Sequence, residues 1–331
     1  TTQRLKCPLS FITLLHIEHG RMKSILARRR ALLLVWIWLA MIGGASADPV
    51  LVLYPEAPDP YRQAFDQIMT GIARTAERPV HRHRIAATTE RAQIQDGLDP
   101  AEPDATVVIL GQPMATLAEI RQSLDPHRRI FVSGINALPG QIPWPGVSLI
   151  IEPQRYLQTL HAVAPHIQIV IAFYHAQDQA WVPLATQAAH AIGLHLEPIA
   201  VTDAVSAVQR LTETLKTLDP QTTALWFTAN TIELDSELLF PWILEQTWAR
   251  NIVAFSDTIT HAKRGFLFAL SPDYLEVGAE LGRRLHASGT QAKFSLTRAA
   301  RFALNLRTAR HLGLPVPDDL IRRADRLFPQ P

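Results

Sequence analysis

Short apolar or β-branched runs alternate with amphipathic segments along most of this chain, and this alternation restricts the fold more than any other sequence feature. Regular alternation of strand and helix predicts an α/β protein whose parallel sheets are covered on both faces. Such sheets bind ligands at the carboxyl ends of their strands. The predicted strands are Val50–Tyr54, Thr106–Leu110, Arg129–Ser133, Val147–Ile151, Ile167–Tyr174, Leu196–Val201, Ala224–Thr228, Ile252–Phe255 and Gly265–Leu270, with a weaker one at Arg82–Ala87.

Three segments between these runs have the periodicity of amphipathic helices. Asp203 precedes one of them and is well placed to cap it. The tail at Leu320–Phe328 predicts a further short helix. The apolar stripes are Tyr61, Phe65, Ile68 and Ile72; Val205, Val208, Leu211, Leu215 and Leu218; and Tyr274, Gly278, Leu281 and Leu285, the last with Glu276, Glu280, Arg283 and Arg284 facing away.

The first 47 residues differ in charge from the rest of the chain. They hold seven of the 32 Lys and Arg residues but one of the 30 acidic residues. The remaining 284 residues therefore contain 25 basic and 29 acidic residues, a net charge of about −4. Because the basic excess is confined to one short segment, we expect no nucleic-acid partner.

The same segment has the three-part layout of a secretory signal peptide. Lys23 and Arg28–Arg30 precede the twelve apolar residues Ala31–Ile42, and the small residues Ala45-Ser46-Ala47 follow. We expect export, cleavage after Ala47 and a periplasmic location. The alternative is a retained membrane anchor, but a spanning helix needs about 20 apolar residues. We interpret residues 1–21, before a start at Met22, as an over-extended reading frame.

The sequence lacks the residues that several kinds of binding and catalytic chemistry require. The one cysteine, Cys7, lies in the first segment, which leaves the body without a disulfide, a thiolate metal site or a cysteine nucleophile. The sequence has no phosphate loop, dinucleotide-binding glycine motif, nucleophile elbow or zinc-protease motif. Ser256, Asp257 and His261 form a loose cluster whose local spacing is not diagnostic. We expect no enzyme activity, no cofactor and no metal.

His81-Arg82-His83-Arg84 allows two interpretations. Two histidines on one strand face suggest a metal or polyanion site. The neighbouring arginines disfavour a cation, and no third ligand is near in sequence. We therefore expect a solvated edge strand.

Near its C-terminus, the chain resembles a known protein family. Residues 303–325 contain Asn305-Leu306, Thr308-Ala309, Leu312-Gly313-Leu314, Pro317 and Arg323-Ala324-Asp325. This run closely resembles the closing segment of the periplasmic substrate-binding proteins of the tryptophan-type ABC transporter family. Upstream, Ala254–Gly265 and Ser271–Gly282 resemble that family's last hinge crossing and the helix after it.

The resemblance implies a type I periplasmic-binding-protein fold. Two Rossmann-like lobes with parallel sheets would be joined by a three-stranded hinge and close on a small ligand. Lobe 1 would hold residues 48–152 and 258–300, and lobe 2 would hold residues 153–257 and 301–331. A concentration of Pro and Gly between residues 139 and 165 agrees with a passage between two lobes.

The resemblance also places the ligand site in loops at strand ends. The family has a Gly-Thr-Pro turn where this chain has Gln112 in the middle, and an Asp-Pro where this chain has Asn136. Asn230 matches a family Asp-Asn turn, whereas Ala229 does not. The hinge loop around Asp257 matches best. The candidates carried over in this way are Gly111, Gln112, Pro113, Asn136, Asn230 and Asp257.

Other candidates come from their chemistry at strand ends. Tyr54 and Tyr174 supply flat surfaces for stacking, and Glu56, Asp178 and Asp257 supply carboxylates for a ligand amine. Trp226 lies in the middle of a strand, so we expect it in the core.

These observations favour the solute receptor of an ABC-type importer, which captures a small molecule, such as an amino acid or another small organic solute, and delivers it to a membrane permease. The alternative is a sensory binding protein that presents its ligand-bound form to a membrane receptor kinase or cyclase. Both roles require the same cleft, and the sequence does not choose between them.

Overall fold

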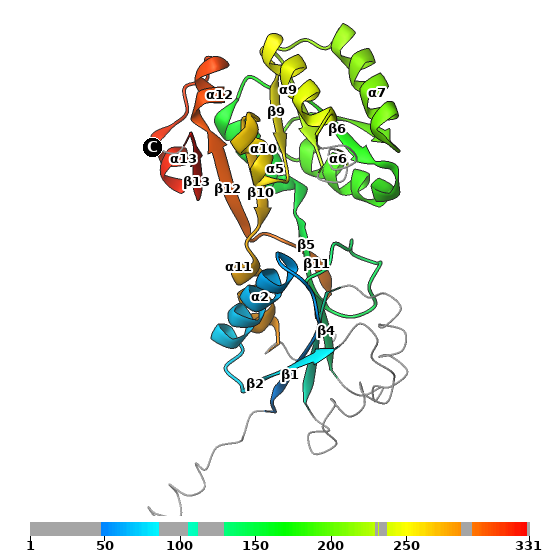
Figure 1. Ribbon diagram of the computed structural model, residues 1–331, viewed down its shortest axis with the longest axis vertical. Helices are drawn as coiled ribbons and strands as arrows, with labels where there is room; N and C mark the ends of the chain where they lie inside the picture. Colours follow the sequence, from blue (N-terminus) through cyan, green and yellow to red (C-terminus); the bar gives the residue numbers. More distant parts are fainter. Residues whose placement is uncertain are drawn as a thin grey trace, which may run out of the picture. The chain divides into compact units, whose positions relative to one another are not determined.

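Two sheets organise the protein, each with its own helices. The computed structural model describes residues 48–85, 105–111, 129–228, 231, 237–285 and 293–329 (Figure 1). The segment proposed as a signal peptide lies outside these residues. Within the described ranges, no helix has both the length and the hydropathy that crossing a bilayer requires.

The first sheet has six strands in the order β11-β5-β4-β3-β1-β2, and every pairing is parallel. Most of its strands are buried β-branched or leucine runs, as the sequence predicts. β2 forms one edge, and three of its six side chains are exposed, which confirms the solvated edge strand expected there. The strands are β1 (Val50–Pro55), β2 (Val80–Ile85), β3 (Thr106–Leu110), β4 (Ile130–Ser133), β5 (Gly146–Ile151) and β11 (Phe294–Thr297).

The second sheet has seven strands in the order β13-β12-β10-β9-β8-β6-β7. Its pairings are parallel except that β12 runs antiparallel to β10. The strands are β6 (Ile169–His175), β7 (His195–Val201), β8 (Thr223–Phe227), β9 (Val253–Ser256), β10 (Phe268–Pro272), β12 (Ala300–Asn305) and β13 (Arg326–Phe328).

Both sheets repeat one strand order. In each, the first strand lies between the second and the third, and the fourth and fifth follow outward. This is a doubly wound arrangement whose winding reverses beside the first strand. The reversal lies between β1 and β3 in the first sheet and between β6 and β8 in the second. Crevices at such points are where open α/β sheets bind ligands.

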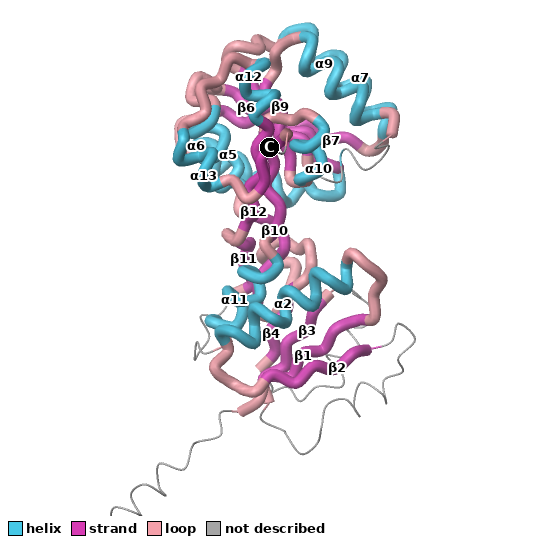
Figure 2. The backbone as a smooth tube through the Cα atoms, turned by 60° about the vertical axis from the view of Figure 1, so that its left-hand side comes forward, coloured by secondary structure: helices cyan, strands magenta, loops and turns pink. Residues whose placement is uncertain are grey.

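Helices lie against the sheets (Figure 2), and the contacts are made by buried apolar side chains of the strands and helices. In the first lobe, α2 (Tyr61–Thr75) and α11 (Tyr274–Arg284) bury residues such as Ile68 and Leu281 against one sheet face. In the second lobe, α7 (Ala204–Thr217) and α9 (Leu239–Ala249) cover one face. The other face packs against α5 (Pro153–Val163), α6 (Val182–His190), α12 (Leu306–His311) and α13 (Asp318–Arg323).

Glycines allow α2 and α11 to approach very closely. A Cβ added at Gly71 would overlap the backbone of α11, and one added at Gly278 would overlap the backbone of Ile68. Thr75 Oγ1 also donates a hydrogen bond of 2.9 Å to the carbonyl of Ala279. Within the third predicted stripe, Gly278 therefore makes a close helix–helix contact, because it has no side chain.

In the described part of the chain, the backbone passes between the two lobes three times. The passages follow β5 at Glu152, β10 at Asp273 and β11 at Arg298. Ion pairs connect them: Arg298 Nε lies 2.8 Å from Glu152 Oε2, and Arg301 Nε lies 3.4 Å from Asp273 Oδ2.

The second passage differs from the expected boundary at residue 258. Helix α10 (Ile259–Arg264) and β10 belong to the second lobe, because β10 pairs with β9 and β12. The resemblance had suggested a crossing within Ala254–Gly265. The sheet register places it instead at Asp273, which caps α11 by accepting hydrogen bonds from Leu275 N and Glu276 N.

Two helix predictions need correction. On α7, Asp203 forms the expected cap as part of a capping box, and Leu211 is buried as predicted. Val205 and Val208 are exposed, however, and Ala207, which was not in the predicted stripe, is buried. On α11, Glu280 and Arg284 form a half-buried ion pair rather than facing away.

The tail predicted as one helix is helix α13 followed by strand β13. This strand pairs with β12, and the carboxylate of Asp325 accepts a hydrogen bond of 2.7 Å from Phe302 N. Pairing with a distant strand therefore overrides the local helical pattern of Leu320–Phe328.

Candidate functional site

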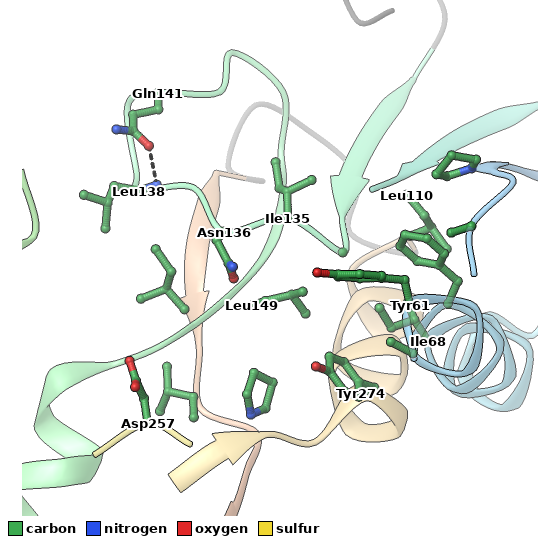
Figure 3. Close-up of a pocket in the computed structure, with 18 of the residues that line it drawn as sticks. Tyr61, Ile68, Leu110, Ile135, Asn136, Leu138, Gln141, Leu149, Asp257 and Tyr274 are labelled. Atoms are coloured by element: carbon green, nitrogen blue, oxygen red, sulfur yellow. Dashed lines mark hydrogen bonds between the residues drawn. The ribbon is translucent and has the colours of Figure 1, made fainter. Parts of the chain in front are cut away.

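A cavity of about 800 Å³ lies where strands of both sheets reach their carboxyl ends (Figure 3). Its walls include the ends of β1 and β3 from the first sheet and of β6 and β8 from the second. These are the strands on either side of the two winding reversals. The cavity therefore occupies the position at which the topology favours a ligand.

Tyrosines dominate the wall formed by the first lobe. Tyr54 ends β1, Tyr61 opens α2 and Tyr274 opens α11. Figure 3 shows the rings of Tyr61 and Tyr274 extending from their helices toward the cavity, with the amide of Asn136 opposite them. Burial and the neighbouring Tyr61 raise the pKa of Tyr274, so its hydroxyl stays protonated and can donate a hydrogen bond.

The loop after β4 adds amide groups to this wall. Asn136 is exposed and follows the buried residue Ile135. Gln141 Oε1 accepts a hydrogen bond of 2.7 Å from Leu138 N, which holds the loop in a closed turn (Figure 3). The Asn136 side chain therefore projects from a loop whose conformation is constrained by the hydrogen bond between Gln141 and Leu138.

A cluster of aromatic rings in mutual contact forms the wall on the second lobe. Trp226 of β8 has ring centroids 4.9 Å from Tyr156, 4.8 Å from Trp181 and 5.4 Å from Phe255. Tyr174, at the end of β6, lies 6.4 Å from Trp181. Because Trp226 is 1% exposed, it belongs to the core as predicted and also forms the floor of the cavity.

All five tyrosines of the chain line this one cavity. Two of its seven tryptophans, Trp181 and Trp226, do so as well. Elsewhere the described core is built mainly from Phe and aliphatic side chains. The tyrosines are thus gathered where a ligand would need both a flat surface and hydrogen bonds.

Charged groups in the described lining are all acidic. Glu56, Asp178 and Asp257 contribute carboxylates, and the described lining contains no Lys, Arg or His. Asp257 acts on its surroundings: burial, together with the charge of this carboxylate, raises the pKa of Tyr156 well above its usual value. The Tyr156 hydroxyl therefore stays protonated, and it donates a hydrogen bond of 3.3 Å to the carbonyl of Leu270.

The structure brings together six of the ten residues that the sequence suggested for the site: Tyr54, Glu56, Asn136, Tyr174, Asp178 and Asp257. Gly111 lies outside the lining, where its positive φ of 82° turns the chain after β3 against Phe65. Gln112, Pro113 and Asn230 lie outside the described residues.

Sequence reasoning missed Tyr61, Tyr156, Trp181 and Tyr274 as lining residues. Tyr61 and Tyr274 were assigned to the apolar stripes of helices, yet each stands in the first turn of its helix, at the end nearest the strand termini. That position was the available signal, because the first turn of a helix in a doubly wound fold lies close to the ligand crevice.

The cluster of Ser256 and His261 is real but lies outside the lining of this cavity. Ser256 Oγ and His261 Nδ1 are 3.0 Å apart, both residues are buried, and the imidazole stacks on Phe240. This pair is part of the core of the second lobe. Among the described residues, no group of three or more His, Cys, Asp or Glu could hold a metal ion.

Comparison with solved structures identifies the architecture. An ABC domain from Streptococcus pneumoniae in complex with L-Trp matches with a TM-score of 0.52 at 16% identity, over 86% of this chain and 100% of that one. A ligand-free, open substrate binding protein with adhesive properties from Clostridium difficile gives 0.61 at 11% identity, over 85% and 99%. A periplasmic ribose ABC transporter from Conexibacter woesei gives 0.52 at 12% identity, over 85% and 100%.

The fold is that of the type I periplasmic-binding proteins. At such low identity the likeness shows the fold alone. No model of a known protein family matches the sequence, and no curated protein does.

Proposed function

We propose that this protein is a periplasmic solute receptor that captures a small organic molecule and delivers it to the permease of an ABC-type importer. The fold supports binding, and the resemblance of residues 303–325 to importer receptors supports delivery. The short apolar run before Asp48 supports export. The resemblance to the tryptophan-type family supports the importer class and does not specify the ligand.

One observation carries the binding role: the cavity at both winding reversals collects every tyrosine of the chain. A tyrosine offers a flat apolar face and a hydroxyl, and a small-molecule site needs both. Because the walls come from two lobes joined by short passages, a ligand that contacts both walls favours arrangements in which those walls are near each other.

A thermal-shift screen of the purified protein tests binding. The panel contains amino acids, amines, nucleosides, sugars and small organic acids. A ligand at about 100 times its dissociation constant stabilises the fold by about 2.7 kcal/mol, which raises the melting temperature by several degrees. The expected hits carry a flat ring. If no compound changes the melting temperature, solute binding is wrong.

Uptake of the radiolabelled hit tests delivery. Cells that express the protein are compared with cells from which it has been deleted, and with deleted cells that express Tyr274→Leu. We expect uptake only with the unaltered protein. Binding without any difference in uptake would overturn the importer role and favour the sensory alternative.

A further inference from the structure

We propose that the ligand of the aromatic cavity is an organic cation: a protonated amine or quaternary ammonium group attached to a flat or apolar body. This proposal rests on the solute-binding function proposed above and names the class of solute. It is carried by the combination of charge and aromatic surface in the cavity lining.

The charge of the described lining has one sign. Three carboxylates stand in the wall, Glu56 from the first lobe and Asp178 and Asp257 from the second, with no basic side chain among the described lining residues. Glu56 also lies 3.6 Å from Arg84, but both side chains are more than 60% exposed, so solvent screens that pair. Asp257 lies in the aromatic wall, and its charge contributes, after burial, to the raised pKa of Tyr156.

The aromatic lining complements the same charge. The faces of Tyr and Trp rings carry negative electrostatic potential and attract cations within about 6 Å of their centroids. Tyr61 is 64% exposed at the cavity wall, and Tyr54 and Tyr274 are half-buried, so these rings have surface available to a ligand. A cation placed between such rings and a carboxylate gains from both interactions.

The indole N–H of Trp226 is a further polar group in the cavity wall. Trp226 is 1% exposed and lines the cavity, and its indole N–H has no hydrogen-bond partner among the described residues. Buried donors are almost always paired in folded proteins. An oxygen atom on the bound molecule, or a water held by it, would supply the missing acceptor.

An anionic ligand does not fit this lining. A carboxylate on the ligand would enter a cavity that already contains three, and transfer of an unpaired charge out of water is costly. A neutral ring would gain the stacking but not the attraction to Asp257 and Asp178. We therefore expect a cation to bind this cavity more tightly than its neutral isostere, and the neutral isostere to bind more tightly than the anion.

Four compounds that share one phenyl ring separate these possibilities: phenethylamine, phenylethanol, 3-phenylpropionate and phenylalanine. Titration calorimetry with the purified protein at low salt measures each affinity. We expect phenethylamine to bind at least tenfold more tightly than phenylethanol, with 3-phenylpropionate weakest. If phenylethanol, 3-phenylpropionate or phenylalanine binds best, the cation proposal is wrong and solute binding stands. If none binds while the wider panel gives a hit that is not a cation, the same conclusion follows.

Two sets of variants locate the contacts. Asp257→Asn removes one charge at constant shape, so it should weaken phenethylamine binding about tenfold and leave phenylethanol unchanged. Glu213→Gln, an exposed change on α7 outside the cavity, is its matched control. Tyr274→Phe keeps the ring and should keep the affinity, whereas Tyr274→Leu should lower it. Unaltered melting temperatures establish that the variants are folded. Equal affinity of the wild type and Asp257→Asn for the amine would overturn the role of this carboxylate in the proposal.

Discussion

The buried imidazole of His261 makes the stability of the second lobe depend on pH. Its side chain is 5% exposed, its Nδ1 lies 3.0 Å from Ser256 Oγ, and its ring centroid is 4.7 Å from that of Phe240. Burial, and to a smaller extent the charge of Arg264, lowers the pKa of His261 from 6.5 to about 4. The folded protein therefore keeps the ring neutral over a pH range in which the unfolded chain protonates it.

The magnitude follows from the two pKa values. Between the unfolded value of 6.5 and the folded value of about 4, the unfolded chain binds more protons, so stability falls as the pH falls. One pKa unit corresponds to about 1.4 kcal/mol, so the full loss below the folded value is about 3 kcal/mol. Between about pH 7.5 and about pH 5 the expected loss is about 2 kcal/mol.

Urea unfolding followed by far-UV circular dichroism measures this loss at both pH values. The variant His261→Phe keeps an aromatic ring against Phe240, and Ser256 Oγ retains its hydrogen bonds with Thr258. We expect the wild type to lose about 2 kcal/mol more than His261→Phe on acidification. His195→Gln, at a side chain that is 70% exposed, should lose as much as the wild type. Equal losses in the wild type and His261→Phe would refute the assignment.

Two further predictions concern local packing. Gly278→Ala should destabilise the first lobe by about 1–3 kcal/mol, because the new methyl group overlaps the backbone of Ile68. Glu276→Ala, on the exposed face of α11, is the control. Equal urea unfolding midpoints for the two variants would contradict the close helix contact. Asp203→Ala should cost about 1 kcal/mol, because Ser206 N loses its acceptor at 2.7 Å; an unchanged unfolding midpoint would show that the cap contributes nothing.

Strands with strong local signals could be predicted from the sequence. Apart from Tyr54, runs such as Val50–Tyr54 and Thr106–Leu110 are β-branched or aliphatic throughout, and the structure buries those residues. β11 escaped prediction because Phe294–Thr297 is short and half polar, and its strand state depends on pairing with β5. Edge strands of this kind owe their conformation to a partner distant in sequence, which periodicity does not report.

Helix faces were predicted less well than helices. On α7, the sequence favours Val205 because it is apolar, but the helix turns Ala207 toward the sheet and leaves Val205 66% exposed. A small residue gives little hydrophobic signal, yet it allows the backbone to approach the strands. The same physics explains Gly278, whose value to the packing lies in having no side chain.

For the site, the sequence located loops but not the cavity they share. Tyr54 and Tyr174 stand at ends of predicted strands and could be proposed directly. Tyr156 comes from the interior of α5, so its place in the wall depends on how that helix crosses the second sheet. The three carboxylates could also be proposed from the sequence, whereas the lack of a basic side chain among the described lining residues depends on which residues the fold brings together.

Because the chain passes between the lobes three times, neither lobe can finish folding until late in synthesis. The first lobe receives α11 and β11 only after the central strands of the second lobe have been made, and the second lobe receives β12 and β13 later still. A nascent chain that ends before Asp273 would leave the apolar face of α2 uncovered and expose an edge in each sheet. Such intermediates aggregate readily. The C-terminal segment therefore completes both lobes, and a chain shortened before Asp273 would tend to aggregate rather than fold as a smaller protein.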